Sequence, residues 1–158
     1  MADDAEIIAI SNALDANDRA LTVHEAGHAA VAHGLGAELC FVEIELATGN
    51  GWSRSSVFDD NVKNLAVCVA GCRAEHAFGA SSPRATKIGD FRDMRKILSN
   101  FPAAKRRAAR AEGYRLADVT LKANADVVHR IASALFARRF EDRARIEGAE
   151  LGVLLADY

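Results

Sequence analysis

Apolar residues at helical spacing cover most of the chain and predict a mainly helical protein. The apolar side chains of residues 7–14 recur with the helical period, and Asp3 and Asp4 place negative charge where a helix N-terminus favours it. We expect this first helix to end near Asn17. A second helix should follow directly and close at Gly34.

One segment changes to the period of a β-strand. In CFVEIEL, residues 40–46, Val42 and Ile44 flank Glu43 in an apolar–polar alternation that is typical of a strand with one covered face. The turn-like ATGNG follows. Residues 52–57 are then expected to form a second strand that pairs with the first as a hairpin.

Two further helices are predicted in the middle of the chain. The first spans residues 61–78 and is capped by Asp59 or Asp60. The loop GASSPRATKIG then leads to Asp90, which we expect at the N-terminus of a helix that Pro102 ends.

The residues from Ala103 onward have the amphipathic pattern of a helical hairpin, with a break at Gly113. We therefore expect one mainly α domain over residues 1–158. It should carry an N-terminal helical extension over residues 1–18 and a C-terminal helical hairpin over residues 103–158.

Composition and charge narrow the function. The chain has 158 residues, half of them apolar, which is enough for one core. Its 20 Lys and Arg residues against 22 Asp and Glu residues give a net charge of −2, so no general field attracts nucleic acid. The basic run at positions 105–110 has no interleaved aromatic residues and is interpreted as a solvated helix face.

The chain also lacks the signals of a membrane or secreted protein. Its longest core stretch without charged or His residues, residues 65–72, is far shorter than the ~20 residues of a membrane helix. The acidic start MADDAEIIAI lacks the Lys or Arg of a secretory signal, and three cysteines are an odd number. We expect a cytoplasmic protein without a membrane span, in which Cys68 and Cys72 are buried thiols.

His24, Glu25 and His28 form an H-E-x-x-H motif. Histidines four positions apart project from one face of a helix, so both imidazoles can bind one zinc ion while Glu25 leans over the metal's open side. A shuffled chain of this composition contains roughly 0.01 such motifs, so chance is not the main alternative. An ordinary helix remains the competing interpretation, but burying two imidazoles and a carboxylate without a metal carries a substantial desolvation cost.

A catalytic zinc needs a third protein ligand and one open position for water. His33 follows His28 by five residues and points off the zinc face, so this ligand must come from elsewhere. Asp90 is attractive because backbone N–H groups at a helix N-terminus can hold its carboxylate, although a plain helix cap explains it too. The remaining candidates are Glu75, His76, Asp93 and His129.

Three longer stretches resemble a known family. HEAGHAAVA, VCVAGCRAEHAFG and LKANADVVHRIASALFARR, the last followed by IEGAEL, are similar to the zinc peptidase domain of FtsH-like, membrane-associated ATP-dependent proteases over residues 21–155. The resemblance implies a helical zincin-type domain with a small β-hairpin or short sheet beside the H-E-x-x-H helix. It also implies Asp90 as the third ligand, with Asp93 as runner-up, and it favours a place for Glu75 near the site over a salt bridge with Arg73.

The resemblance also implies a function. We expect a zinc metallopeptidase that hydrolyses peptide bonds in unfolded or short polypeptides, with a zinc-activated water and Glu25 as general base. The strand at 40–46 is expected to bind substrate by edge addition. Because the sequence has no G-x-x-x-x-G-K-[ST] phosphate loop, a separate ATPase or adaptor would have to unfold proteins. A homo-oligomer is compatible with the resemblance, since FtsH-like domains form rings.

Two other functions compete with peptide hydrolysis. One is a non-catalytic, peptidase-like interaction or regulatory module, which the missing unfoldase suggests. The intact Glu25 argues against it, because a structural zinc site has no use for a general base. The other is a zinc hydrolase that acts on something other than peptides.

Overall fold

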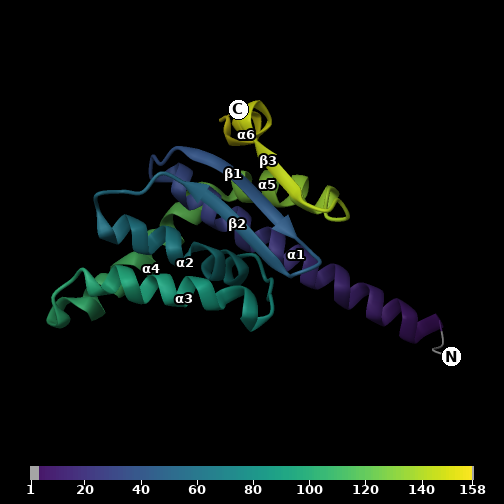
Figure 1. Cartoon of the computed structure of the whole chain (residues 1–158), viewed down its shortest axis with the longest axis horizontal. Coiled ribbons are helices and arrows are strands. Elements are labelled where there is room, and N and C mark those ends of the chain that lie inside the picture. The colour runs from purple at the N-terminus through teal and green to yellow at the C-terminus, as the bar shows by residue number, and fades with distance from the viewer. Residues whose placement is uncertain (1–3, 158) are drawn as a thin grey trace.

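Helices and one small antiparallel sheet make up the computed structural model, which describes residues 4–157 (Figure 1). This architecture confirms the predicted mainly α fold with a short sheet. The elements in chain order are α1 (Asp4–Gly34), β1 (Leu39–Glu45), β2 (Asn50–Ser55), α2 (Asn61–Ala77), α3 (Arg84–Ser99), the 3₁₀ turn η1 (Ala103–Lys105), α4 (Arg106–Ala123), α5 (Ala125–Ala137), β3 (Ala144–Glu147) and α6 (Gly148–Leu155).

Helix α1 is one continuous helix where two were expected, so the predicted break near Asn17 is wrong. The polar stretch at residues 15–18, where the break was expected, lies against Arg139. Its guanidinium group forms ion pairs with Asp15 at 3.4 Å and Asp18 at 3.5 Å. These contacts stabilise a segment whose own helix propensity is low.

The first turns of α1 project from the body of the molecule (Figure 1). We call residues 4–14 the N-terminal arm. The expected extension over residues 1–18 is thus the first part of α1 and not a separate helix, and Asp3 lies outside the described residues. The large apolar side chains of the arm are all more than half exposed: Ile7, Ile8, Ile10 and Leu14.

The sheet has the strand order β2-β1-β3, with both pairs antiparallel. The predicted hairpin is therefore confirmed. The third strand falls inside the segment that was expected to be wholly helical, and that expectation is wrong. In β3, Ala144 and Ile146 are buried while Arg145 and Glu147 are exposed, but four residues are too short for this alternation to stand out in the sequence.

Strand β1 is the central strand, and this position has two consequences. Glu43, expected on an open face, is buried, and its carboxylate pairs with Arg145 at 3.3 Å and with Arg143 at 3.6 Å. Both edges of β1 are hydrogen-bonded to neighbours, so substrate cannot add there as expected. The free edge on the hairpin side belongs to β2.

Helix α2 begins at Asn61 as predicted and ends at Ala77, one residue before the predicted end. The Asp60 side chain accepts hydrogen bonds from the backbone N–H groups of Val62 and Lys63, and Gly79 has a φ of 67° just past the end. Helix α3 differs, because it begins directly after Pro83. Asp90 therefore lies in the second turn of α3 and not at its N-terminus.

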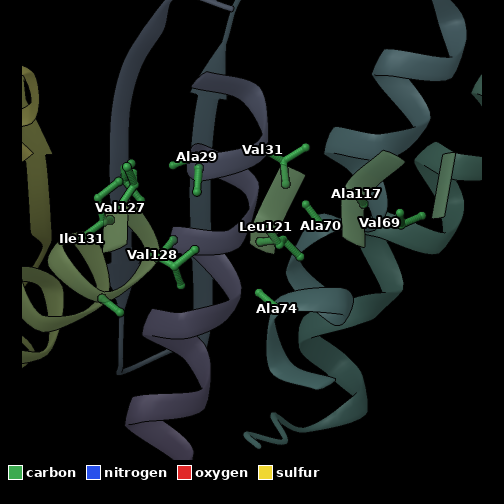
Figure 2. Close-up of a cluster of buried hydrophobic side chains, with 14 of the residues drawn as sticks. Ala29, Val31, Val69, Ala70, Ala74, Ala117, Leu121, Val127, Val128 and Ile131 are labelled. Atoms are coloured by element: carbon green, nitrogen blue, oxygen red, sulfur yellow. The ribbon is translucent and has the colours of Figure 1, made fainter. Parts of the chain in front are cut away.

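The core lies where α1 crosses α2 and where α4 and α5 pack beside them (Figure 2). Gly27 allows the close approach of α1 and α2, since a Cβ there would overlap the Ala74 Cβ. Helix α4 runs through Gly113, which packs against Leu65, so the expected break is absent. The chain breaks instead at Asn124.

Candidate metal centre

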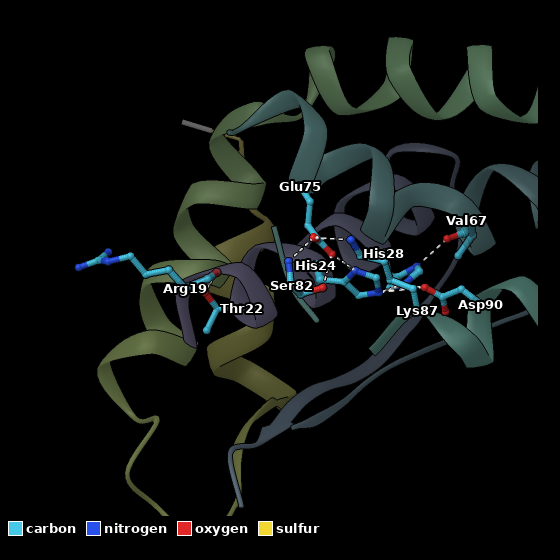
Figure 3. A network of polar contacts seen from close by, with 9 residues as sticks. All are labelled: Arg19, Thr22, His24, His28, Val67, Glu75, Ser82, Lys87 and Asp90. Carbon is cyan, nitrogen blue, oxygen red and sulfur yellow. Dashed lines mark hydrogen bonds and ion pairs between the residues drawn. The ribbon is translucent and has the colours of Figure 1, made fainter. Parts of the chain in front are cut away.

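His24 and His28 lie one turn apart on the buried part of α1 and turn the same edge of their rings toward Asp90 on α3 (Figure 3). Their Nε2 atoms are 3.1 Å apart. The Asp90 Oδ2 atom lies 2.9 Å from His24 Nε2 and 3.2 Å from His28 Nε2. The structure thus brings these three residues into one cluster capable of holding a metal ion.

The far edge of each imidazole is held by an acceptor. His28 Nδ1 donates to the backbone carbonyl of Val67 at 2.7 Å, and His24 Nδ1 donates to Glu75 Oε1 at 2.6 Å. A carbonyl or carboxylate oxygen can only accept, so the proton of each neutral ring lies on Nδ1. Both Nε2 lone pairs therefore face the centre of the cluster.

The chemistry of this donor set fits a divalent cation. Two lone pairs and one carboxylate oxygen converge with no hydrogen-bond donor between them, an arrangement that needs a positive charge. Ligand atoms around a tetrahedral zinc lie about 3.3 Å apart, close to the 2.9–3.2 Å found here. A proton can supply this positive charge as well as a metal ion: although burial opposes it, the hydrogen bonds that His24 donates to Asp90 and Glu75 raise the pKa of His24 to about 9. Burial also opposes ionisation of Asp90, but the two histidines lower its pKa.

Glu75 anchors the cluster from behind. It is 2 % exposed, and besides His24 it accepts hydrogen bonds from the backbone N–H of Ser82 at 2.6 Å and from the Ser82 hydroxyl at 2.7 Å. Lys87 Nζ on α3 lies 3.2 Å from its second oxygen. Burial disfavours the charged carboxylate, but the bonds from His24 and Ser82 lower the pKa of Glu75 to about 2. Glu75 is therefore ionised and fixes the orientation of His24.

Glu25 lies on the groove side of the cluster. Its side chain is 4 % exposed, and among residues 4–157 it forms no hydrogen bond through its carboxylate. Gly51 on β2 packs directly against it, and a Cβ there would lie 2.6 Å from Glu25 Cδ. Burial raises the pKa of Glu25, although the two neighbouring histidines oppose the shift.

A groove of about 770 Å³ opens in front of the cluster, with Glu25, His28 and Asp90 along one side. Its other walls come from β2, from the β2–α2 connection, and from the facing sides of α2 and α3. Trp52, Phe58, Asn64, Ile97 and Asn100 are among the lining residues.

Other candidate ligands lie elsewhere. The Asp93 side chain is 53 % exposed and is paired with Arg92 and Lys96, both at 3.7 Å, so it does not join the histidines. His76 is exposed, and the His129 ring packs edge-on against Phe78. His33, as expected, lies outside the cluster.

Cys40, Cys68 and Cys72 are free thiols, and among the described residues none of them belongs to the His24–His28–Asp90 cluster. Cys68 Sγ donates to the backbone carbonyl of Asp90 at 3.1 Å. Burial raises the pKa of Cys68 to about 12 and the pKa of Cys72 to about 11. Both side chains are half-buried rather than fully buried, and Cys40 is exposed.

Several residues that shape the cluster were missed in the sequence. Ser82 and Lys87 lie in a stretch that was interpreted only as a loop, and nothing in the pattern connects them to Glu75. Gly71 packs against the His24 ring, so that a Cβ would lie 2.6 Å from Cδ2. The small-residue run VAGC was the one signal that α2 approaches another element closely. Arg73, considered as a partner of Glu75, instead pairs with Asp118 at 2.7 Å.

Comparison with family models and with curated proteins finds no match for this sequence. No helix within residues 4–157 has the length and apolar character needed to cross a lipid bilayer. The functional proposal therefore depends on the geometry of the His24–His28–Asp90 cluster and of the groove beside it.

Proposed function

We propose that this protein is a zinc-dependent peptidase. One observation carries the proposal: two fixed imidazoles and a carboxylate converge beside buried Glu25, whose carboxylate forms no hydrogen bond among residues 4–157, and His28, Asp90 and Glu25 border one groove. A structural zinc site closes its fourth position with protein. Among the described residues, the cluster contains three ligand groups, and its remaining side faces the groove.

His24, His28 and Asp90 would hold the zinc ion. When bound, zinc lowers the pKa of a coordinated water and polarises the carbonyl of the scissile bond. The residues around it do the rest. Glu75 and the Val67 carbonyl keep both imidazoles in the tautomer that presents Nε2.

Glu25 would act as the general base. Its carboxylate borders the groove, and no neighbour among residues 4–157 occupies its oxygens with a hydrogen bond. Burial raises its pKa, which increases its affinity for a proton. Glu25 can therefore accept a proton from the attacking water and transfer it to the leaving amine.

The free edge of β2 suits an extended polypeptide. Asn50, Gly51, Trp52 and Ser53 of this strand line the groove. A peptide that adds to this edge gains backbone hydrogen bonds that do not depend on its sequence. Only unfolded or short polypeptides can present such an extended backbone, so these are the proposed substrates.

The resemblance to FtsH-like zinc peptidase domains supports the same class of substrate. In this proposal an ATPase or adaptor delivers the unfolded chain to the groove. The resemblance also supports a homo-oligomer.

The decisive experiment compares Glu25→Gln with wild type. We expect the variant to bind one equivalent of zinc by elemental analysis and to lose about 10²–10⁴-fold of the rate of cleavage of fluorescein-labelled casein. Glu38→Gln is the matched control, because Glu38 is exposed and lies outside the groove lining. Unchanged cleavage by Glu25→Gln would overturn the proposal. Zinc binding by wild type without any cleavage would favour the non-catalytic module.

A further inference from the structure

Positive charge is concentrated at one end of the molecule. Residues 92–110, which we call the basic tip, contain seven Lys and Arg residues and one acidic residue. The remaining positions contain 13 Lys and Arg residues against 21 Asp and Glu residues. The tip comprises the second half of α3, the turn η1 and the start of α4, at the end of the molecule opposite the N-terminal arm (Figure 1). The net charge is thus +6 on the tip and −8 over the remaining positions, although the total is only −2.

The charges of the basic tip are not neutralised by their neighbours. Arg95, Lys105 and Arg107 are exposed and form no ion pair with any residue between positions 4 and 157. The single acid, Asp93, contacts Arg92 and Lys96 at 3.7 Å, the outer range for an ion pair. A surface with this excess of one sign attracts an anionic partner.

The basic tip is continuous with the groove. Arg92, Ile97 and Asn100 belong to the tip and also line the groove in front of the metal cluster. A polypeptide that leaves the groove at this end must pass over the second half of α3. We propose that the basic tip binds an acidic stretch of the substrate polypeptide, a few residues away from the bond in the groove. This inference rests on the proposed peptidase function, and it adds a preference for acidic flanking sequence.

A short acidic peptide fits this surface better than a nucleic acid does. The excess of acidic residues outside the tip repels a long polyanion that extends beyond it. A stretch of a few Asp or Glu residues contacts the tip alone. The groove, moreover, offers a strand edge in β2, which recognises a polypeptide backbone.

The test measures binding separately from cleavage. Zinc-loaded Glu25→Gln protein is titrated against fluorescent peptides that share one neutral core. Each peptide carries four Glu, four Gln or four Lys residues, placed either before or after the core, so that there are two peptides of each kind. Fluorescence anisotropy should give about tenfold tighter binding for one of the two Glu peptides than for its Gln counterpart at low salt. The difference should shrink as ionic strength rises. The Lys peptides should bind most weakly.

Charge reversal localises the effect. Lys105→Glu/Arg107→Glu in the Glu25→Gln background should abolish the preference for Glu peptides and leave binding of the Gln peptide unchanged. Arg115→Glu/Lys122→Glu is the matched control, since it changes the net charge equally at two positions of α4 that lie beyond the tip, which ends at residue 110. Circular dichroism confirms that both variants fold.

Three results would overturn the inference. They are equal binding of Glu and Gln peptides, an unchanged preference in Lys105→Glu/Arg107→Glu, or displacement of the Glu peptide by an oligonucleotide of equal charge at lower concentration. Cleavage of the Gln peptide by the protein with an intact Glu25 is measured in parallel. If that cleavage fails while the Glu preference persists, the peptidase proposal falls and the acidic docking surface stands. If cleavage proceeds without a preference, only the docking surface falls.

Discussion

The two sides of the His24–His28–Asp90 cluster differ in their hydrogen bonding. On the rear side, Glu75 is buried and both of its oxygens are occupied by His24, Ser82 and Lys87. On the front side, Glu25 is equally buried but forms no hydrogen bond through its carboxylate among residues 4–157, and it faces the groove. Both glutamates are therefore buried, but they differ in how many hydrogen-bond partners their carboxylates have.

This difference in hydrogen bonding suits the two glutamates to different roles: Glu75 orients His24, and Glu25 is free to contact a water or a substrate. A carboxylate with all its partners in place is fixed, and it fixes the imidazole attached to it. A carboxylate without partners retains lone pairs for a water or a substrate, and its pKa rises with burial. The pKa of Glu75 is lowered and the pKa of Glu25 is raised, which agrees with the proposed roles of Glu75 as an anchor and of Glu25 as a base.

The largest loss of zinc affinity is expected from adding a side-chain atom on the Glu75 side of the cluster, where helix α2 packs against His24. Gly71→Ala places a Cβ against the His24 ring, so either the ring or helix α2 must move. We expect the unfolding free energy to fall by about 1–3 kcal/mol, as measured by urea denaturation. Zinc affinity should fall by more than the roughly 100-fold that losing an outer partner costs.

Gly152→Ala is the control for this change. A Cβ at position 152 of α6 meets nothing within 4 Å, so its effect on zinc affinity should be absent. Full zinc affinity in Gly71→Ala would show that the rear side is not rigid and would remove the contrast between the two sides.

The same substitution on the front side should damage catalysis without removing the metal. Gly51→Ala places a Cβ against the Glu25 carboxylate and displaces it. A displacement of about 1 Å at a reacting group costs roughly 100-fold in kcat. We expect that loss in casein cleavage, with zinc content by elemental analysis equal to wild type. Loss of zinc from Gly51→Ala would mean that the front side also holds the ligands.

The smallest effect is expected when the anchor keeps its shape but loses its charge. In Glu75→Gln the amide oxygen can still accept from His24 Nδ1, whereas its NH₂ group cannot accept from the Ser82 backbone. Zinc affinity should fall about 10–100-fold in competition with a chromophoric chelator. Cleavage at saturating zinc should stay near the wild-type rate, and a lost rate under those conditions would assign Glu75 a role in the reaction itself.

Local signals explain which parts of the fold were predictable. Asp60 and Gly79 mark both ends of α2 by capping chemistry, and the alternation in residues 40–46 marks β1. The continuity of α1 was not predictable, because it depends on Arg139, which is distant in sequence. β3 is too short to show its period.

The candidate site likewise contains features that the sequence predicts and features that it does not. The spacing of His24 and His28 places both rings on one side of α1, so this pair follows from the sequence alone. Asp90 was predicted at the N-terminus of a helix, but it lies in the second turn of α3, and its carboxylate contacts the two imidazoles from there. The sequence alone did not reveal this, because α3 begins directly after Pro83, which is a less conspicuous start signal than an aspartate.

One tether in the cluster is made by the main chain. The Val67 carbonyl orients His28, and every amino acid carries that oxygen, so no exchange of the side chain at this position deletes the acceptor. Sequence drift at position 67 can reshape the groove wall while leaving the imidazole in its tautomer. The orientation of one of the two imidazoles therefore depends on the backbone path of helix α2. A comparison of side-chain identities at position 67 would not reveal this contact.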